Sequence, residues 1–351
     1  MNESAHLSGI STRLIPTKRL RVRILECGDS GGEPIVFVHG NFSAASYFEE
    51  LMLSMPDHFR CIAVDLRGYG QTEDLPIDAT RGARDWSDDL RAVFVALGIT
   101  RTHLLGWSAG AAAIMQFLID KPTMVQSLTL VAPVSPYGFG GTKDLAGTPC
   151  YGDFSGSGGG VVNPAFVDRI KAKDYSSDTP LSPRNVINQS FVSPPFAFAR
   201  EDQLLSCSLE QRVGEKRYPG DSVSSTNWPF CSPGNWGPIN ALSPKYLDLS
   251  AVATVVNPPP ILWIRGDKDI VISDNSSSDS GVLGEMGLIS EWPGDKVFPS
   301  QPMVSQMRQL LDQYRNNGGE YREIVMQNVG HSPFLEKPKE FLKELLDLIA
   351  K

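Results

Sequence analysis

Residues 103–118, HLLGWSAGAAAIMQFL, place an apolar run before a serine and a run of small and apolar residues after it. The first run predicts a buried strand over His103–Trp107, and the second predicts a helix over Ala109–Leu118. Ser108 then occupies the turn between them, in the pattern G-x-S-x-G. Side chains two residues to either side of the serine would collide with the neighbouring strand and helix, so glycine at both positions allows a sharp turn that exposes the hydroxyl.

Runs of β-branched and apolar residues predict seven further strands, and helical spacing of apolar residues predicts helices between them. The expected strands are Thr12–Ile15, Leu20–Glu26, Ile35–His39, Arg60–Leu66, Ser127–Val131, Ile261–Arg265 and Tyr321–Gln327. The expected helices outside the central unit are Arg84–Leu97, Pro302–Tyr314 and Pro338–Ile349. This alternation predicts an α/β fold with a mostly parallel, eight-stranded sheet and helices on both of its faces.

Residues 134–257 differ in character from both flanks. They are rich in glycine, proline and aromatic residues, with a helical piece expected at Asn163–Ala172. The aromatic content favours a folded cap over a disordered insertion. We therefore predict a core formed by residues 1–133 and 258–351 and an inserted cap domain. A second insertion, Ser273–Phe298, is expected along the rim of the opening that the cap covers. The simpler interpretation is that it is a solvated loop with no catalytic part.

His331 is the candidate general base for Ser108. It lies between a glycine and a Ser-Pro pair, after the last predicted strand and before the last helix, so its side chain is free to project. Of the other four histidines, His6 lies near the amino terminus and His39 lies beside a glycine after a predicted strand. His58 lies in a polar loop, and His103 begins a predicted strand. His39 is expected to be a buried structural histidine that bonds to the backbone.

Four further motifs stand in order around the strand-turn-helix unit. They are HGNF at residues 39–42, DLRGYGQT at 65–72, GDKD at 266–269 and GHSP at 330–333. Together with G-x-S-x-G, these motifs resemble those of the α/β-hydrolase family, and the resemblance covers the two segments that flank the cap. The cap itself matches no pattern that would identify a substrate. The resemblance implies a serine hydrolase whose oxyanion hole uses the backbone amides of Ala109 and of Asn41 or Phe42. It also implies that Asp65 and Arg67 hold a loop and take no part in catalysis.

The resemblance leaves a choice for the acid that orients His331. Some relatives carry this acid after the sixth strand, but residues 131–135, VAPVS, contain no carboxylate. The later position remains, where the family's acid stands three residues after the strand-ending glycine. This spacing selects Asp269, whereas Asp267 lies nearer the strand end and is expected to cap the turn.

Four aromatic residues are candidates for lining a substrate pocket. Phe42 and Trp107 flank the implied oxyanion hole, and Trp228 and Trp236 lie in the predicted cap. Apolar and aromatic side chains line most small-molecule sites. Simple core packing is the alternative for each of these rings, because aromatic residues also dominate protein cores.

The chemistry that these residues predict is acyl transfer. His331 would take the proton of Ser108, the alkoxide would attack a carbonyl carbon, and water would hydrolyse the acyl-enzyme. A serine rather than an aspartate nucleophile favours carbonyl substrates. We expect a carboxylic ester or lactone of a neutral small molecule, by analogy with this scaffold, with carbon–carbon bonds or amides as alternatives. The alternative from another class is a ligand-binding receptor with little turnover, and a covalent label on Ser108 separates the two.

The composition limits the partners. The 351 residues carry a formal net charge of −8, with 41% hydrophobic and 21% charged residues, which is typical of a globular protein that does not bind nucleic acid. No stretch is apolar enough to span a bilayer, and the amino-terminal segment has no apolar core of a secretion signal. We therefore expect a cytoplasmic protein that acts on a small molecule away from membranes, as a monomer or homodimer.

The remaining motifs argue against bound groups. No nucleotide-binding glycine motif and no histidine pair with metal-ligand spacing is present, so neither a cofactor nor a metal is expected. The five cysteines are odd in number and widely spread, which predicts no disulfide framework. Cys207 and Cys231 are the one candidate pair.

Overall fold

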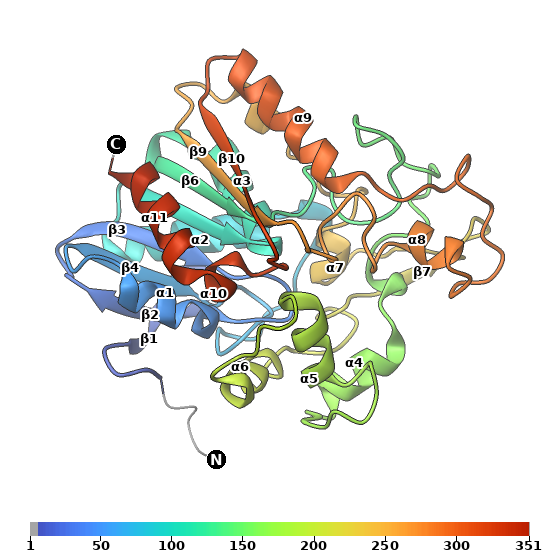
Figure 1. Ribbon diagram of the computed structural model, residues 1–351, viewed down its shortest axis with the longest axis horizontal. Coiled ribbons are helices and arrows are strands. Elements are labelled where there is room, and N and C mark those ends of the chain that lie inside the picture. Colours follow the sequence, from blue (N-terminus) through green and yellow to red (C-terminus); the bar gives the residue numbers. More distant parts are fainter. Residues whose placement is uncertain (1–5, 351) are drawn as a thin grey trace.

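The computed structural model describes residues 6–350 and centres on one eight-stranded sheet (Figure 1). Residues 1–5 and 351, which belong to the predicted core and include the start of the amino-terminal segment, lie outside the described residues. The strand order is β1-β2-β4-β3-β5-β6-β9-β10. The strands are β1 (Ser11–Pro16), β2 (Arg21–Gly28), β3 (Glu33–Val38), β4 (Phe59–Val64), β5 (Thr102–Trp107), β6 (Val125–Val131), β9 (Ile261–Gly266) and β10 (Tyr321–Met326).

Most neighbouring strands of this sheet are parallel, as predicted. Only β1 with β2 and β2 with β4 pair in the antiparallel sense, and the neighbours from β4 to β10 are parallel. The predicted strands and main helices begin and end within two residues of the observed bounds. Because parallel strands end at the same edge, the loops that follow β3, β5, β9 and β10 meet there.

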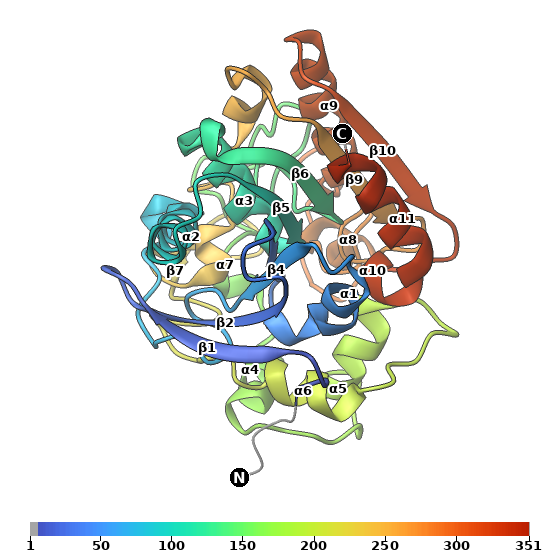
Figure 2. The ribbon, with the colours of Figure 1, turned by 90° about the vertical axis from the view of Figure 1, so that its left-hand side faces the viewer.

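Helices cover both faces of the sheet, as predicted. α2 (Arg84–Leu97), α3 (Ala109–Asp120) and α9 (Met303–Asn316) pack on one face, and Figure 2 shows α2 and α11 on opposite sides. The other face carries α1 (Glu49–Ser54), α10 (Pro333–Glu336) and α11 (Pro338–Ile349). Alternation along β3 explains the division, because Val36 and Val38 join the first cluster and Phe37 joins the second. Short 3₁₀ turns are η1 (Ala45–Phe48), η2 (Ala79–Arg81) and η3 (Pro122–Met124).

Residues 134–257, the predicted cap, form short elements joined by long connections, and Figure 1 shows α4 to α6 gathered beside the sheet. The helical piece expected at Asn163–Ala172 is α4. The end of the segment packs against α3 and α9, so it is buried with the core. The elements are η4 (Gly159–Val161), α4 (Pro164–Lys171), α5 (Pro183–Val186), the π-helical turn η5 (Ile187–Phe191), α6 (Glu201–Ser208), β7 (Ser222–Ser224), β8 (Cys231–Pro233), α7 (Pro238–Ala241) and η6 (Ser250–Thr254).

The second insertion, Ser273–Phe298, is folded against the cap. It contains α8 (Ser280–Glu285), and its last residue, Phe298, is fully buried. The ring centroid of Phe298 lies 4.8 Å from that of Trp228. Trp228 Nε1 also donates to the backbone oxygen of Ser290, at 2.8 Å. Aromatic contacts therefore anchor the segment on the cap, while most of residues 285–297 are exposed.

All five cysteines are free thiols. Cys207 on α6 and Cys231 at the start of β8 are both free, so the candidate pair does not form a disulfide. Within residues 6–350, no helix has both the length and the apolar composition that crossing a membrane requires.

Candidate active site

Ser108 occupies a strained turn between β5 and α3. Its φ of 55° and ψ of −119° are rare for a residue with a side chain. A Cβ atom on Gly106 would lie 2.7 Å from the backbone oxygen of Gly110. A Cβ atom on Gly110 would overlap the backbone oxygens of Val38 and His39. Both glycines are thus required by the close approach of α3 to β3 and β5, which is the steric reason inferred from the sequence.

His331 and Asp269 are brought together by the loops that follow β10 and β9. His331 Nδ1 lies 2.8 Å from Asp269 Oδ2, and each side chain is only 2% exposed. The other carboxylate oxygen accepts hydrogen bonds from the backbone amides of Val271 and Ile272, at 2.8 and 2.9 Å. Three donors therefore hold the carboxylate in place, and its bond to Nδ1 sets which ring nitrogen of His331 carries the proton.

Trp107 connects this pair to the turn that carries Ser108. Its Nε1 donates to the backbone oxygen of His331, at 2.8 Å, and the two ring centroids lie 5.5 Å apart. Because Trp107 precedes Ser108 directly, the histidine loop and the serine turn cannot shift independently without breaking this bond. The remaining ring nitrogen of His331, Nε2, is then the one available for proton transfer.

Asp267 has different contacts from Asp269. Its backbone amide donates to the oxygen of Met326, at 3.0 Å, and its Oδ1 accepts from the amide of Val329, at 3.3 Å. Both partners belong to the chain that leads from β10 toward His331. Asp267 therefore braces the junction between the two loops and does not contact the imidazole.

The HGNF loop approaches Ser108 closely. A Cβ atom on Gly40 would lie 2.9 Å from Ser108 Cβ and 3.5 Å from its Oγ, so only glycine leaves room there. Phe42 adopts a positive φ of 51°. Asn41 Oδ1 accepts a hydrogen bond from the Tyr69 hydroxyl, at 2.9 Å, which leaves its amide nitrogen with the donor hydrogens. Ala109 begins α3, where backbone amides have no partner within the helix.

His39, Asp65 and Arg67 are buried structural groups. His39 Nε2 accepts from the amide of Leu66, at 3.0 Å, and burial lowers the pKa of the imidazole. Asp65 bonds to Arg23 and to the amides of Ala45 and Gln71, whereas Arg67 pairs with Asp89. Each residue therefore has partners of its own and holds a loop, as the resemblance implies.

A cluster of aromatic rings lies against the histidine and includes a cap residue that sequence reasoning missed. The ring centroid of Phe191 lies 5.1 Å from that of Trp107 and 6.3 Å from that of His331. Tyr47 packs against both Trp107 and Phe191, and Phe42 packs against Phe166 of α4. No motif or periodic pattern distinguishes Phe191 from the other aromatic residues of the cap, so no signal in the sequence could have found it.

Trp228 and Trp236 make their contacts elsewhere. Trp228 packs on Phe298 in the second insertion. Trp236 lies under the ammonium group of Lys216, 4.4 Å from the ring centroid, and its backbone amide donates to Asp221. The contacts of these two rings therefore order the cap. Trp107, by contrast, directly precedes Ser108, and Phe42 belongs to the HGNF loop.

Glu336 of α10 is a second residue that the sequence interpretation missed. Its carboxylate accepts hydrogen bonds from the backbone amides of Gly330 and Ser193. Burial raises the pKa of the Glu336 carboxyl, and the hydrogen bonds from Ser193 and Gly330 oppose that rise. Its position three residues after a Ser-Pro pair could have suggested a helix-terminal role, but not a partner in the cap.

Among residues 6–350, no group of three or more His, Cys, Asp or Glu could hold a metal ion.

Comparison with known proteins places this geometry among hydrolases. Residues 35–344 match the alpha/beta hydrolase family. The uncharacterized carboxylesterase nap of Bacillus subtilis is 24% identical over 213 residues, which cover 57% of this chain and 69% of that protein. The 2-hydroxy-6-oxo-2,4-heptadienoate hydrolase of Pseudomonas putida is 33% identical over 106 residues, which cover 29% of this chain and 38% of that protein.

Solved structures agree over nearly the whole chain. The esterase RhEst1 from Rhodococcus sp. ECU1013 has a TM-score of 0.61 and 19% identity, and the match covers 98% of this chain and 99% of that one. At this identity the structural likeness establishes the fold alone.

Proposed function

The chain belongs to the alpha/beta hydrolase family, and we propose that it is a serine hydrolase acting through an acyl-enzyme on Ser108. The proposed substrate is a carboxylic ester or lactone of a neutral small molecule. Similarity to the carboxylesterase nap supports an ester as the first choice. The observation that carries the proposal is the buried contact between His331 and Asp269, linked through Trp107 to the serine turn.

In the proposed mechanism, His331 accepts the proton of Ser108 as the serine oxygen attacks the substrate carbonyl carbon. The Asp269 carboxylate holds the proton on Nδ1, which leaves the lone pair on Nε2, and it stabilises the imidazolium that forms. Backbone amides of Ala109 and of Asn41 or Phe42 stabilise the oxyanion. His331 then protonates the leaving alcohol, and the same histidine activates the water that hydrolyses the acyl-enzyme.

The surroundings of the site favour a neutral substrate with apolar parts. The buried arginines of the described chain, Arg23 and Arg67, are already paired with Asp65 and Asp89. A carboxylate on the substrate would therefore find no free buried cation among residues 6–350, and an unpaired buried charge is costly. The surroundings of His331 are instead apolar, since the buried rings of Trp107 and Phe191 pack beside it.

A second candidate is hydrolysis of a carbon–carbon bond or an amide by the same three residues. Similarity to the Pseudomonas putida hydrolase of 2-hydroxy-6-oxo-2,4-heptadienoate favours this candidate. The substrate in that enzyme's name is an anion, which conflicts with the pairing of both buried arginines. A ligand-binding receptor with little turnover would need neither an activated serine nor a tautomer-fixing carboxylate.

The test is covalent labelling combined with a substrate panel. A fluorophosphonate probe should add one adduct to the wild-type protein and none to Ser108→Ala, because only an activated serine reacts quickly. Intact-mass analysis measures the adduct. An unlabelled wild type, or a Ser108→Ala variant that is labelled as fast, would show that the nucleophile is misassigned.

The panel then separates the candidate reactions. Purified protein is offered p-nitrophenyl esters of increasing acyl length, lactones, anilides and ring-cleavage products with a ketone beside the scissile bond. Turnover of neutral esters or lactones is the expected result. A labelled protein that cleaves only the anilides or the carbon–carbon substrates would favour the second candidate, and one that turns over nothing would favour the receptor.

A further inference from the structure

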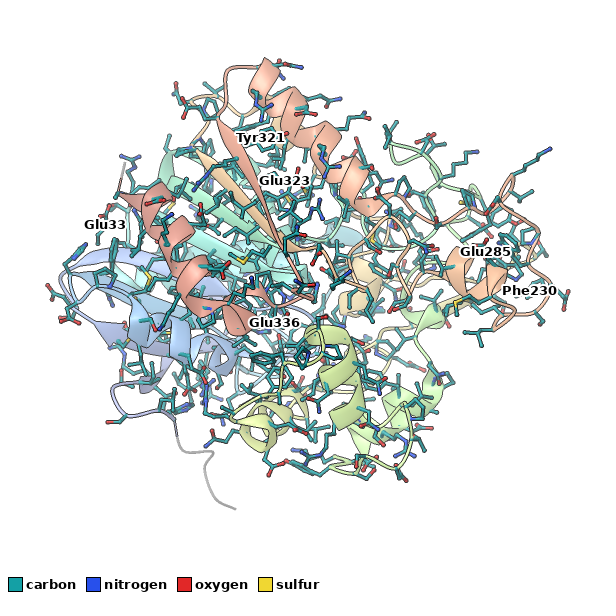
Figure 3. All side chains as sticks on the ribbon, viewed as in Figure 1. Glu33, Phe230, Glu285, Tyr321, Glu323 and Glu336 are labelled. Atoms are coloured by element: carbon teal, nitrogen blue, oxygen red, sulfur yellow. The ribbon has the colours of Figure 1, made fainter. Side chains whose placement is uncertain are left out.

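One carboxylate joins the loop that carries the histidine to the cap. Glu336 Oε1 and Oε2 lie 2.9 and 3.0 Å from the backbone nitrogen of Gly330, the residue directly before His331. Glu336 Oε2 also accepts from the backbone nitrogen of Ser193 in the cap, at 2.9 Å. Figure 3 labels Glu336 at the junction between α10 and the cap helices. Hydrogen bonds to an ionised acceptor are about twice as strong as those between neutral groups.

The two segments that Glu336 joins are in direct contact. A Cβ atom on Gly330 would lie 2.8 Å from the backbone nitrogen of Ser193 and 2.8 Å from the carbonyl carbon of Val192. Val192 is itself buried. The bare glycine therefore allows the cap backbone to approach the histidine loop, and the Glu336 carboxylate satisfies the two amides that this approach removes from water.

The cap segment held in this way carries the ring that covers the histidine. Phe191 stands two residues before Ser193, and its ring lies against both Trp107 and His331. The backbone oxygen of His331 is fixed on the other side by Trp107 Nε1. The imidazole thus has a fixed backbone and a fixed apolar cover, and Glu336 contributes to both.

We propose that Glu336 is a positioning residue for the hydrolysis, which holds the backbone before His331 and the cap segment 187–193 in one arrangement. This inference rests on the proposed function, because the histidine that Glu336 positions is the proposed general base. Glu336 contacts neither Ser108 nor the imidazole through any described bond. Its effect is exerted through Gly330 and Ser193.

The test compares Glu336→Gln with Glu340→Gln. Both backbone amides bond to Oε2, so a glutamine oxygen at that place keeps both contacts without the charge that strengthens them. Its NH₂ group then takes the place of Oε1, 2.9 Å from the backbone nitrogen of Gly330, where two donors repel, so the hold on both segments is weakened. Glu340 offers a matched control, since its side chain is 63% exposed and pairs only with Lys337 in the described chain. Turnover of p-nitrophenyl butyrate is expressed per active site, with the sites counted by fluorophosphonate adduct at completion.

The expected result for Glu336→Gln is a fall in kcat of about ten- to a hundredfold, because small misplacements of catalytic groups cost this much. KM should change by a smaller factor than kcat, since the histidine acts in the chemical steps and a short acyl group depends little on the cap segment that carries Phe191. A merely destabilising change would lower the number of titratable sites and leave kcat per site unaltered. An unaltered kcat per site would overturn the proposal, and Glu340→Gln should match the wild type.

Hydrogen–deuterium exchange provides a readout that does not depend on activity. In Glu336→Gln, the peptides covering residues 187–193 and 328–332 should both exchange faster than in the wild type. Exchange in the strands of the sheet should not change. No change in either peptide, or an increase spread over the whole chain, would refute the positioning role. If the wild type hydrolyses nothing, the proposed function fails, while the exchange result still decides whether Glu336 joins the two segments.

Discussion

Replacing Asp269 by asparagine tests the assignment of the acid most directly. In the wild type, Asp269 Oδ2 accepts from His331 Nδ1, and Oδ1 accepts from the amides of Val271 and Ile272. An asparagine has one acceptor oxygen, and the two backbone amides fix that oxygen on their side. Its NH₂ group then faces Nδ1 and forces the imidazole to carry its proton on Nε2. The histidine could no longer accept a proton from Ser108.

The expected loss of turnover is large because the substitution changes the tautomer of His331 and does not merely remove a contact. The corresponding substitution in a serine protease lowers turnover on the order of 10⁴-fold, which corresponds to about 5 kcal/mol of transition-state stabilisation. Asp267→Asn keeps its acceptor oxygen for the amide of Val329, a 3.3 Å bond, so its activity should stay within about threefold of the wild type.

The assay is kcat/KM for a p-nitrophenyl ester that the wild type hydrolyses, with circular dichroism and thermal melting as controls for folding. Both variants should melt cooperatively, and only Asp269→Asn should be nearly inactive. If Asp267→Asn loses more activity than Asp269→Asn, the role passes to Asp267. If both retain activity, neither carboxylate orients His331.

Two further predictions concern the cap and the second insertion. Phe191→Ala should change acyl-length preference more than Trp236→Ala does, because Phe191 lies against Trp107, whereas Trp236 packs under Lys216. Identical ester profiles for the two variants would contradict this prediction. Burial raises the pKa of Asp279 to about 6, so its stabilising contribution is complete below the usual value of about 4 and is lost as pH rises through about 6. Asp279→Asn should therefore raise Tm relative to the wild type at pH 8 but not at pH 4; a lower Tm at pH 8 would contradict the prediction.

The sequence by itself determined the features whose causes are local or periodic. Apolar spacing identified the eight strands and the main helices, because burial of one face imposes a period of two or of about 3.6 residues. The glycines around Ser108 were interpretable because the collisions they avoid involve the adjoining strand and helix. The choice of Asp269 came from family spacing, while the distance of 2.8 Å to His331 depends on the parallel register of β9 with β10.

Only the tertiary structure decided which cap residue packs beside His331. The cap consists of short elements without a sustained period, so its arrangement depends on contacts between residues far apart in the chain. Aromatic content alone therefore suggested Trp228 and Trp236 but could not distinguish them from Phe191. The bond from Ser193 to Glu336 joins residues 143 positions apart through a backbone amide, a donor that nearly every residue carries and that no sequence pattern marks.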